Sequence, residues 1–249
     1  MPKTIKYIFY QPFFWLLFIL LSLLLYLLSL LPRIFSGRYY HFLSRVWCRI
    51  FIRILNVDLK LYHRNNRTIP EQYILIANHP SALEDFAIPA LFDIYPLAKA
   101  GVRDWFIIGR ISDFAGTIYV KRARPGSRQA ALKQLTDAVK QGNNIVIFPE
   151  GGCKGARIYK KFHTGAFEIS LTTGIPVLPL FLEYVDRDAF VWSGESLPKK
   201  LWQIFRARDN RVNYYLHDAI SPAGFSDKVS YANYVHSLYL RWQKEYIDT

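Results

Sequence analysis

The sequence predicts an α/β fold in which a central sheet is covered by helices and preceded by N-terminal membrane-associated helices. Short apolar runs that suit buried strands alternate with longer helical segments over most of the chain. Such alternation is typical of a sheet covered by helices. We expect the first 60 or so residues to be associated with a membrane, and the remaining ~190 suffice for one globular domain with a full core. We therefore divide the chain into an N-terminal anchor with a basic amphipathic helix, residues 1–60, and a globular domain, residues 61–249.

The elements of the globular domain follow from local patterns. The expected strands are the apolar or β-branched runs 73–77, 97–99, 117–120, 144–148, 177–183 and 212–216. The expected helices are 81–92, 127–141, 164–173 and 228–245. Segment 186–211 fits neither pattern. It holds Trp192, Trp202 and Phe205 among charged residues, and we interpret it as an interfacial lobe or as peripheral structure.

Segment 13–31 has the length and composition of a membrane anchor. It is uncharged, has Ser22 and Ser29 as its polar residues, and lies between Pro12 and Pro32. A helix that crosses the hydrocarbon core needs roughly 20 such residues. The alternative is a secretory signal peptide, but no small-residue cleavage site follows Leu31. We expect an uncleaved anchor that either crosses the bilayer or is embedded in one leaflet.

A second helix is expected over residues 42–55, where apolar side chains recur at helical spacing. Arg45, Arg49 and Arg53 recur every four residues on another face. This pattern is typical of a basic amphipathic helix at the surface of an anionic membrane, and the alternative is an ordinary helix packed on the domain core. More arginines follow the apolar segment than the two lysines, Lys3 and Lys6, that precede it. The positive-inside rule therefore places the globular domain on the cytoplasmic side.

The chain is strongly basic, with a net charge of +13 and a pI near 9.7. Such a balance suits either nucleic acid or anionic lipid. The sequence contains no nucleic-acid-binding motif and does contain an apolar anchor, so we expect anionic lipid headgroups as partners and no nucleic acid. Its two cysteines, Cys48 and Cys153, indicate neither a disulfide framework nor a zinc cluster.

His79 and Glu84 form the first candidate site. His79 lies between the strand 73–77 and the helix expected at 81–92, whose first turn Pro80 would favour. From this junction a carboxylate on the second helical turn can reach back to the imidazole. Glu84 is the candidate, whereas Asp85 is one step further round and points elsewhere. A histidine oriented by a carboxylate is a general base for chemistry on a hydroxyl group, although an isolated pair of this kind is more often structural.

Two further strand ends carry polar residues. Lys121 and Arg122 follow the strand 117–120, where their side chains could bind a phosphate or form a solvated basic loop. Arg122 suits phosphate better, because a guanidinium group donates two parallel hydrogen bonds. After the strand 144–148, the chain turns through Pro149-Glu150-Gly151-Gly152, where glycines let the backbone approach a ligand closely. The Glu150 carboxylate could accept a hydrogen bond from a substrate hydroxyl.

These sites belong to four sequence blocks. The blocks are Asn78-His79-Pro80-Ser81-x-x-Glu84, Gly116-Thr117-Ile118-Tyr119-Val120-Lys121-Arg122, Phe148-Pro149-Glu150-Gly151 and Ile175-Pro176-Val177-Leu178-Pro179-Leu180. In this order they resemble the glycerolipid and lysophospholipid acyltransferase family, over roughly residues 70–185. The family's first block usually reads His-x4-Asp, and its third commonly continues with Thr-Arg where this chain continues Gly152-Cys153-Lys154. Related acyltransferases that act on lipid A and mannolipids use His-x4-Glu, so Glu84 is compatible with activity.

The resemblance implies a glycerol-3-phosphate acyltransferase-like fold in which the first and third blocks meet at one end of the sheet. Residues 61–249 would be the acyltransferase domain of a membrane-bound O-acyltransferase. It would transfer a fatty acyl group from acyl-CoA or acyl carrier protein to a lysophospholipid hydroxyl, above all to 1-acyl-glycerol-3-phosphate, giving phosphatidate. His79 and Glu84 would be catalytic. The residues expected to bind the acceptor are Arg122, with Lys121 and Lys99 as weaker candidates, for the phosphate, and Glu150 and Gly151 for the glycerol part.

Several alternatives stay open. Because Glu84 replaces the usual Asp, a lyso-ornithine lipid or a glycolipid is the second choice of acceptor. A catalytically idle member that binds lipid or a partner protein is the non-enzymatic hypothesis. Cys153 beside Lys154 is a minor candidate for a nucleophile. We expect no cofactor beyond the acyl thioester co-substrate and no metal, because His79, Glu84 and Glu150 lack the two-histidine spacing of a usual zinc site.

Overall fold

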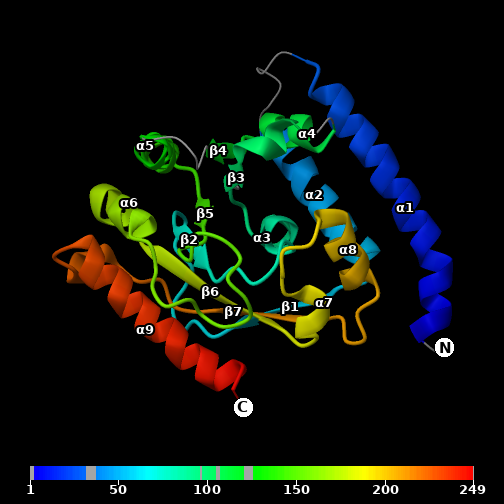
Figure 1. The fold of residues 1–249 in the computed structure, drawn as a ribbon. Coiled ribbons are helices and arrows are strands. Elements are labelled where there is room, and N and C mark those ends of the chain that lie inside the picture. The colour runs from blue at the N-terminus through cyan, green and yellow to red at the C-terminus, as the bar shows by residue number, and fades with distance from the viewer. Residues whose placement is uncertain (1–2, 32–37, 96, 105–106, 121–125, 249) are drawn as a thin grey trace.

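The computed structural model of the chain describes residues 3–31, 38–95, 97–104, 107–120 and 126–248. In these residues a mixed five-stranded sheet is covered by helices on both faces, as the sequence predicts (Figure 1). The strands are β1 (Asp58–His63), β2 (Ile74–Ala77), β3 (Leu97–Lys99), β4 (Ile118–Val120), β5 (Ile145–Ile147), β6 (Val177–Tyr184) and β7 (Arg211–Leu216). The α-helices are α1 (Lys3–Leu28), α2 (Arg38–Ile54), α3 (Glu84–Leu91), α4 (Ile108–Phe114), α5 (Ser127–Lys140), α6 (Gly165–Thr173), α7 (Arg187–Phe190), α8 (Leu197–Phe205) and α9 (Lys228–Tyr246). Two 3-10 helices, η2 and η3, cover Ala100–Asp104 and Pro222–Gly224.

The strand order of the main sheet is β1-β7-β6-β2-β5, and β3 and β4 form a separate parallel pair. Pairing is parallel except between β6 and β7. Since β2 and β5 are parallel neighbours, with Ile76 opposite Ile147, their carboxyl ends lie at the same edge of the sheet. The chain segments that begin at Asn78 and Phe148 therefore leave the sheet side by side.

Strand β2 shows how the sheet is buried on both faces. Leu75 and Ala77 pack in one apolar cluster with residues of α1, α2, α3 and α4, whereas Ile74 and Ile76 pack in a second cluster with α5, α6 and α9. All four side chains have no exposed surface. A strand covered on both faces needs apolar residues at every position, which is why the run was recognisable in the sequence.

Helix α1 packs lengthwise against α2, on the side of α2 away from the sheet (Figure 1). The Trp47 indole N–H donates a hydrogen bond to Ser22 Oγ at 2.8 Å, and the Phe18 ring stacks on Trp47 at 5.0 Å between centroids. Near the other end, the Gln11 amide donates to the Ile54 carbonyl oxygen at 3.0 Å. One face of α1 is therefore part of the protein core.

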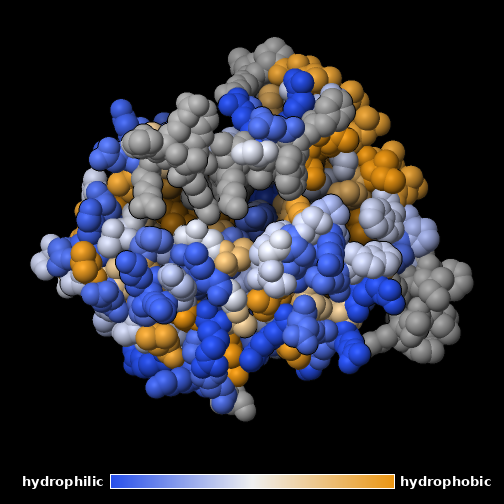
Figure 2. All heavy atoms as spheres, viewed as in Figure 1, coloured by the Kyte–Doolittle hydropathy of each residue, from blue (hydrophilic) through white to orange (hydrophobic). Residues whose placement is uncertain are grey.

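The opposite face of α1 is exposed and apolar. Figure 2 shows the hydrophobic residues gathered along this helix, whereas the rest of the visible face is mostly hydrophilic. Within the described residues, Tyr10–Leu28 is the stretch long and apolar enough to cross a membrane, with a mean hydropathy of 2.2. The helix runs over Lys3–Leu28 instead of the expected 13–31 and includes Pro12. Proline removes only one backbone hydrogen bond, and the contacts with α2 hold the helix on both sides of it.

Two arginines of helix α2 bind the protein itself. The Nε–H groups of Arg45 and Arg49 donate to the carbonyl oxygens of Pro89, at 3.3 Å, and Ala90, at 2.7 Å. These carbonyls lie at the C-terminus of α3, where the last turn lacks helical donors and carries partial negative charge, so cations stabilise it. The apolar face of α2 is buried between α1 and the domain. Helix α2 is thus packed on the core, as the alternative interpretation has it, and its contact with a membrane stays a prediction.

Three other parts of the fold differ from expectation. Strand β1 was not expected, and the boundary drawn at residue 60 falls inside it. Helix α4 was also missed, and the unassigned segment 186–211 contains the short helices α7 and α8. The remaining expected strands and helices of the globular domain are present, with ends that differ by at most three residues.

Candidate active site

The loop that carries His79 is fixed by the side chain of Asn78. Its Nδ2–H donates to the Leu182 carbonyl oxygen at 2.9 Å, and its Oδ1 accepts from the Leu182 N–H at 2.8 Å. The side-chain amide thus pairs with β6 as a strand residue would, just after β2 has ended. Helix α3 then begins at Glu84, so the expected helical start at residue 81 is wrong and Glu84 lies in the first turn.

His79 and Glu84 form a buried pair. His79 Nδ1 lies 3.2 Å from Glu84 Oε2, and Glu84 has no exposed surface. The other carboxylate oxygen, Oε1, accepts hydrogen bonds from the Ser81 N–H at 2.9 Å and the Tyr184 hydroxyl at 2.7 Å. With Oε1 occupied by two donors, Oε2 faces the imidazole. A neutral His79 is then protonated at Nδ1, and Nε2 is its basic nitrogen.

The surroundings of His79 favour its protonated form. Its ring stacks on Phe148 with centroids 4.0 Å apart and planes at 12°. Burial lowers the pKa of His79, but contacts with Cys153 and Glu84 and the charge of Asp85 together raise it well above 6.5. The raised pKa favours the imidazolium form in the resting protein, and this form must lose its proton before it can act as a base.

Glu150 lies beside this pair in an unusual environment. It is 1% exposed, and neither of its carboxyl oxygens makes a well-formed hydrogen bond with another described residue. Burial raises the pKa of Glu150 to about 8, although the charge of His79 acts in the opposite direction. At neutral pH Glu150 is therefore mostly protonated, so it can donate as well as accept a hydrogen bond. The His79 backbone N–H lies close enough to lower the pKa of Glu150, but the buried carboxyl group keeps hydrogen-bonding capacity that a ligand could use.

Two contacts bring the first and third sequence blocks together. The His79 ring stacks on Phe148, and Cys153 Sγ donates a weak hydrogen bond to the Ser81 carbonyl oxygen at 3.4 Å. Gly151 has a backbone φ of +78°, and a Cβ there would come within 2.8 Å of the His163 ring. This turn can therefore accept only glycine at position 151 without strain.

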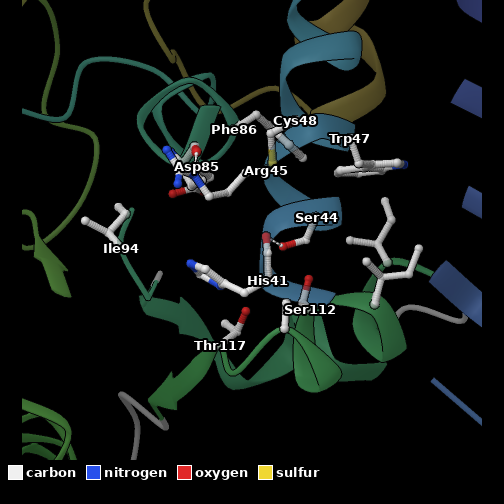
Figure 3. A pocket seen from close by; sticks show the side chains of 14 residues that line it. His41, Ser44, Arg45, Trp47, Cys48, Asp85, Phe86, Ile94, Ser112 and Thr117 are labelled. Atoms are coloured by element: carbon white, nitrogen blue, oxygen red, sulfur yellow. Dashed lines mark hydrogen bonds between the residues drawn. The ribbon is translucent and has the colours of Figure 1, made fainter. Parts of the chain in front are cut away.

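Three of the remaining expected site residues fall wholly or partly outside the described part of the chain. Lys121 and Arg122 are outside the described residues, and Lys99 ends β3, with a side chain that is also outside the described part. Asp85 lines a small cavity of about 80 Å³ between α2, α3 and α4 (Figure 3), and its charge also raises the pKa of His79. In this cavity Asp85 lies near Arg45 of α2 (Figure 3). In the part of the chain that the structure describes, no three His, Cys, Asp or Glu residues are grouped to hold a metal ion.

Sequence reasoning missed Asn78, Ser81 and Tyr184 as parts of this site. The first two belong to the recognised block, but their contribution is made through tertiary hydrogen bonds that no local pattern reveals. Tyr184 lies one residue beyond the expected strand 177–183, where an aromatic residue looks like ordinary core.

The fold and the site define an α/β domain with a buried, carboxylate-oriented histidine where a strand ends. The profile of the acyltransferase family matches residues 60–183, about half of the chain. The chain belongs to this family.

Similar proteins with recorded activities include three that represent different acceptors. Lysophosphatidylcholine acyltransferase of Drosophila melanogaster is 30% identical over 64% of this chain and 30% of its own length. The chloroplastic 1-acyl-sn-glycerol-3-phosphate acyltransferase BAT2 of Brassica napus is 29% identical over 59% of this chain and 43% of its own length. Lyso-ornithine lipid O-acyltransferase of Pseudomonas aeruginosa is 29% identical over 62% of each chain. The chain thus spans less than two thirds of the length of each of these relatives.

A solved structure supports the fold. The crystal structure of PlsC, the 1-acyl-sn-glycerophosphate acyltransferase from Thermotoga maritima, superposes with a TM-score of 0.64. The match covers 91% of this chain and 95% of PlsC at 21% sequence identity. The likeness therefore extends over most of the fold.

Proposed function

We propose that this protein is a membrane-bound O-acyltransferase that moves a fatty acyl group from an acyl thioester to the hydroxyl of a lysophospholipid, with 1-acyl-glycerol-3-phosphate as the main acceptor. The observation that carries the proposal is the buried His79–Glu84 pair, in which Oε1 of the carboxylate is held by two donors and Oε2 faces the imidazole. Named acyltransferases of lysolipids among the relatives support the same reaction class.

The reaction follows from the pair. His79 Nε2 removes the proton from the acceptor hydroxyl as its oxygen attacks the thioester carbonyl carbon. Glu84 holds the Nδ1–H and stabilises the imidazolium that forms. The tetrahedral intermediate then collapses, the C–S bond breaks, and the departing thiolate takes the proton from His79. The products are the acylated lipid and a free thiol, with no covalent acyl-enzyme.

The acceptor site would be built around the pair. Glu150 would form a hydrogen bond with the glycerol part of the acceptor, next to the close backbone approach at Gly151. Arg122 would bind the phosphate, with Lys121 and Lys99 in supporting roles. The thiol of the donor belongs to coenzyme A or to acyl carrier protein.

The direct test is thiol release by the purified protein in mixed micelles, with acyl-CoA or acyl carrier protein as donor and a panel of lysolipids as acceptors. The proposal predicts turnover with 1-acyl-glycerol-3-phosphate and rescue of a conditional strain that lacks phosphatidate synthesis. Turnover only with lyso-ornithine lipid would transfer the assignment to the second acceptor, which the Pseudomonas aeruginosa relative favours. No turnover with any acceptor would support the idle, lipid-binding hypothesis.

For the membrane, we propose that α1 is embedded in one leaflet and that the domain lies on the cytoplasmic side. Leu25 of α1 has no exposed surface, and the Leu25 carbonyl oxygen accepts a hydrogen bond from the Tyr40 hydroxyl at 3.1 Å. A helix that is docked to α2 over most of its length cannot also be surrounded by lipid. Its exposed apolar face can enter the leaflet while its other face stays on the protein.

Labelling from one side of sealed vesicles separates embedding from spanning. Tyr10→Cys and Leu30→Cys place thiols on exposed positions, 59% and 51% exposed, near the two ends of the apolar stretch. In a Cys153→Ser background, an impermeant maleimide should label both variants from the same side. Labelling from opposite sides would show that the helix spans the bilayer.

The contribution of α1 to attachment can be measured separately. Leu20 and Leu24 are 54% and 44% exposed on α1, and a lysine in hydrocarbon costs ~3 kcal/mol. Leu20→Lys with Leu24→Lys should release the protein in an alkaline wash. The matched control is Leu240→Lys on α9, an exposed apolar position on the other side of the domain, which should stay in the membrane.

A further inference from the structure

The carboxylate that orients His79 has a partner of its own on the sheet. Tyr184, at the end of β6, is buried, and its hydroxyl lies 2.7 Å from Glu84 Oε1. Tyr214, on the neighbouring strand β7, places its hydroxyl 3.4 Å from that of Tyr184. The chain of contacts thus runs from the imidazole through one carboxylate to a rigid sheet.

The direction of this hydrogen bond follows from the environment. Burial and the charge of Glu84 raise the pKa of the Tyr184 hydroxyl well above 10. The hydroxyl therefore stays protonated and donates to the carboxylate. The other donor to Oε1 is the Ser81 backbone N–H, which lies in the short turn before α3.

A glutamate needs such support more than an aspartate would. The Glu84 side chain has one more rotatable bond than an aspartate, so more conformers compete with the one in which Oε2 faces Nδ1. A hydroxyl on a buried strand removes most of these conformers, because its own position is fixed by the packing of the sheet. Packing is strong here, since the Tyr184 ring stacks on Phe190 with centroids 5.0 Å apart.

We propose that Tyr184 is a positioning residue, which holds Glu84 Oε1 so that Oε2 orients and pairs with His79. This inference rests on the proposed function, because it assigns Tyr184 a part in the same reaction. The pKa of His79 can be measured without turnover. If Tyr184 holds the pair together, its hydroxyl must affect the proton affinity of His79 from the far side of the carboxylate.

The test is Tyr184→Phe, which removes the hydroxyl and keeps the ring against Phe190. NMR titration of histidine-labelled protein, with the His79 signal assigned from His79→Ala, should show the pKa of His79 falling toward 6.5 as its bond to Glu84 loosens. In thiol release, kcat should fall about 10-fold with the acceptor KM unchanged. Adding the substitution to Glu84→Gln should cost nothing further, because Tyr184 acts through Glu84.

Two controls separate positioning from general damage. Tyr231→Phe removes another buried hydroxyl, which donates to the Ile220 carbonyl oxygen at 2.6 Å, and should leave kcat and the pKa of His79 unchanged. Tyr214→Phe should move both quantities in the same direction as Tyr184→Phe, but less. An unchanged or higher pKa of His79 in Tyr184→Phe, or additive losses with Glu84→Gln, would overturn the proposal. Absence of turnover in the wild-type protein would instead refute the proposed function and leave the titration as the test.

Discussion

Replacing Glu150 by glutamine should stabilise the protein at alkaline pH while impairing its activity. The pKa of Glu150 is raised by burial from 4.5 to about 8, so the folded state holds the proton more tightly than the unfolded state. The stability that this gives is fully present below pH 4.5 and is lost as the pH rises through about 8. At about 1.36 kcal/mol per pKa unit, the loss amounts to about 5 kcal/mol at most. Glu150→Gln keeps the shape of the side chain and cannot ionise.

Urea unfolding followed by tryptophan fluorescence in detergent, at pH 5 and pH 9, measures this difference. The free energy of unfolding of Glu150→Gln should exceed that of the wild type by several kcal/mol at pH 9 and by little at pH 5. Other titrating groups are common to both proteins and cancel. The variant should nevertheless lose turnover. Glu150 is kept in an environment that costs stability because its carboxyl group serves the reaction, so removing this group gains stability and loses activity.

Glu183→Gln on β6 is the matched control. The Glu183 carboxylate accepts hydrogen bonds from the Asn213 amide at 3.0 Å and the Tyr215 hydroxyl at 2.9 Å, so it already has partners. Its replacement should bring no gain in stability between pH 5 and pH 9. An equal stability difference at both pH values for Glu150→Gln would refute the reasoning, since it would show that Glu150 is not held protonated in the folded protein.

The remaining predictions concern the pair and the phosphate. Glu84→Gln should lose most of its turnover and shift the acid limb of the kcat/KM profile to lower pH. Glu84→Asp should retain part of the activity, and Asp85→Asn should be tolerated. The reverse ranking in thiol release would show that the wrong acid has been chosen. Arg122→Lys should raise the KM for a phosphate monoester acceptor but have less effect with an acceptor that lacks this group. Equal losses with both acceptors would make Arg122 a structural residue.

Much of the sheet was predictable because its strands are buried on both faces. Strand β2 is the clearest case, since all four of its residues are apolar and fully buried. Strand β1 lies at the sheet edge, where its outward positions are polar, and the alternating sequence Asp58–His63 gave no continuous apolar run. Edge position, and not weak pairing, explains this omission, because all six of its residues pair with β7.

The features around the site and in α2 that the sequence did not reveal come from tertiary contacts. The helix expected from residue 81 starts at Glu84, because the Ser81 N–H donates to the Glu84 carboxylate. In α2, helical periodicity predicted an apolar face and an arginine face but not the segments that each face contacts. Arg45 and Arg49 have the spacing of a lipid-binding surface, yet they cap the end of α3, a helix 40 residues later whose position only the fold defines.

The spacing of His79 and Glu84 indicated that they form a pair, but not how firmly it is held. A short-range pattern can place a carboxylate near an imidazole. It does not show that Tyr184, 100 residues further along the chain, donates to that carboxylate. The first sequence block therefore predicts the catalytic pair. The hydrogen bond from Tyr184 that holds Glu84 is seen only in the folded sheet.

The measurement that tests the account most directly is the rate of thiol release by His79→Ala, compared with the wild type and with His236→Ala, in which the half-buried histidine of α9 is removed. The account predicts a loss of roughly 100-fold or more for His79→Ala, with folding and membrane association intact, because the base that takes the hydroxyl proton is gone. His236→Ala should keep full activity. Near-normal turnover in His79→Ala would contradict the mechanism.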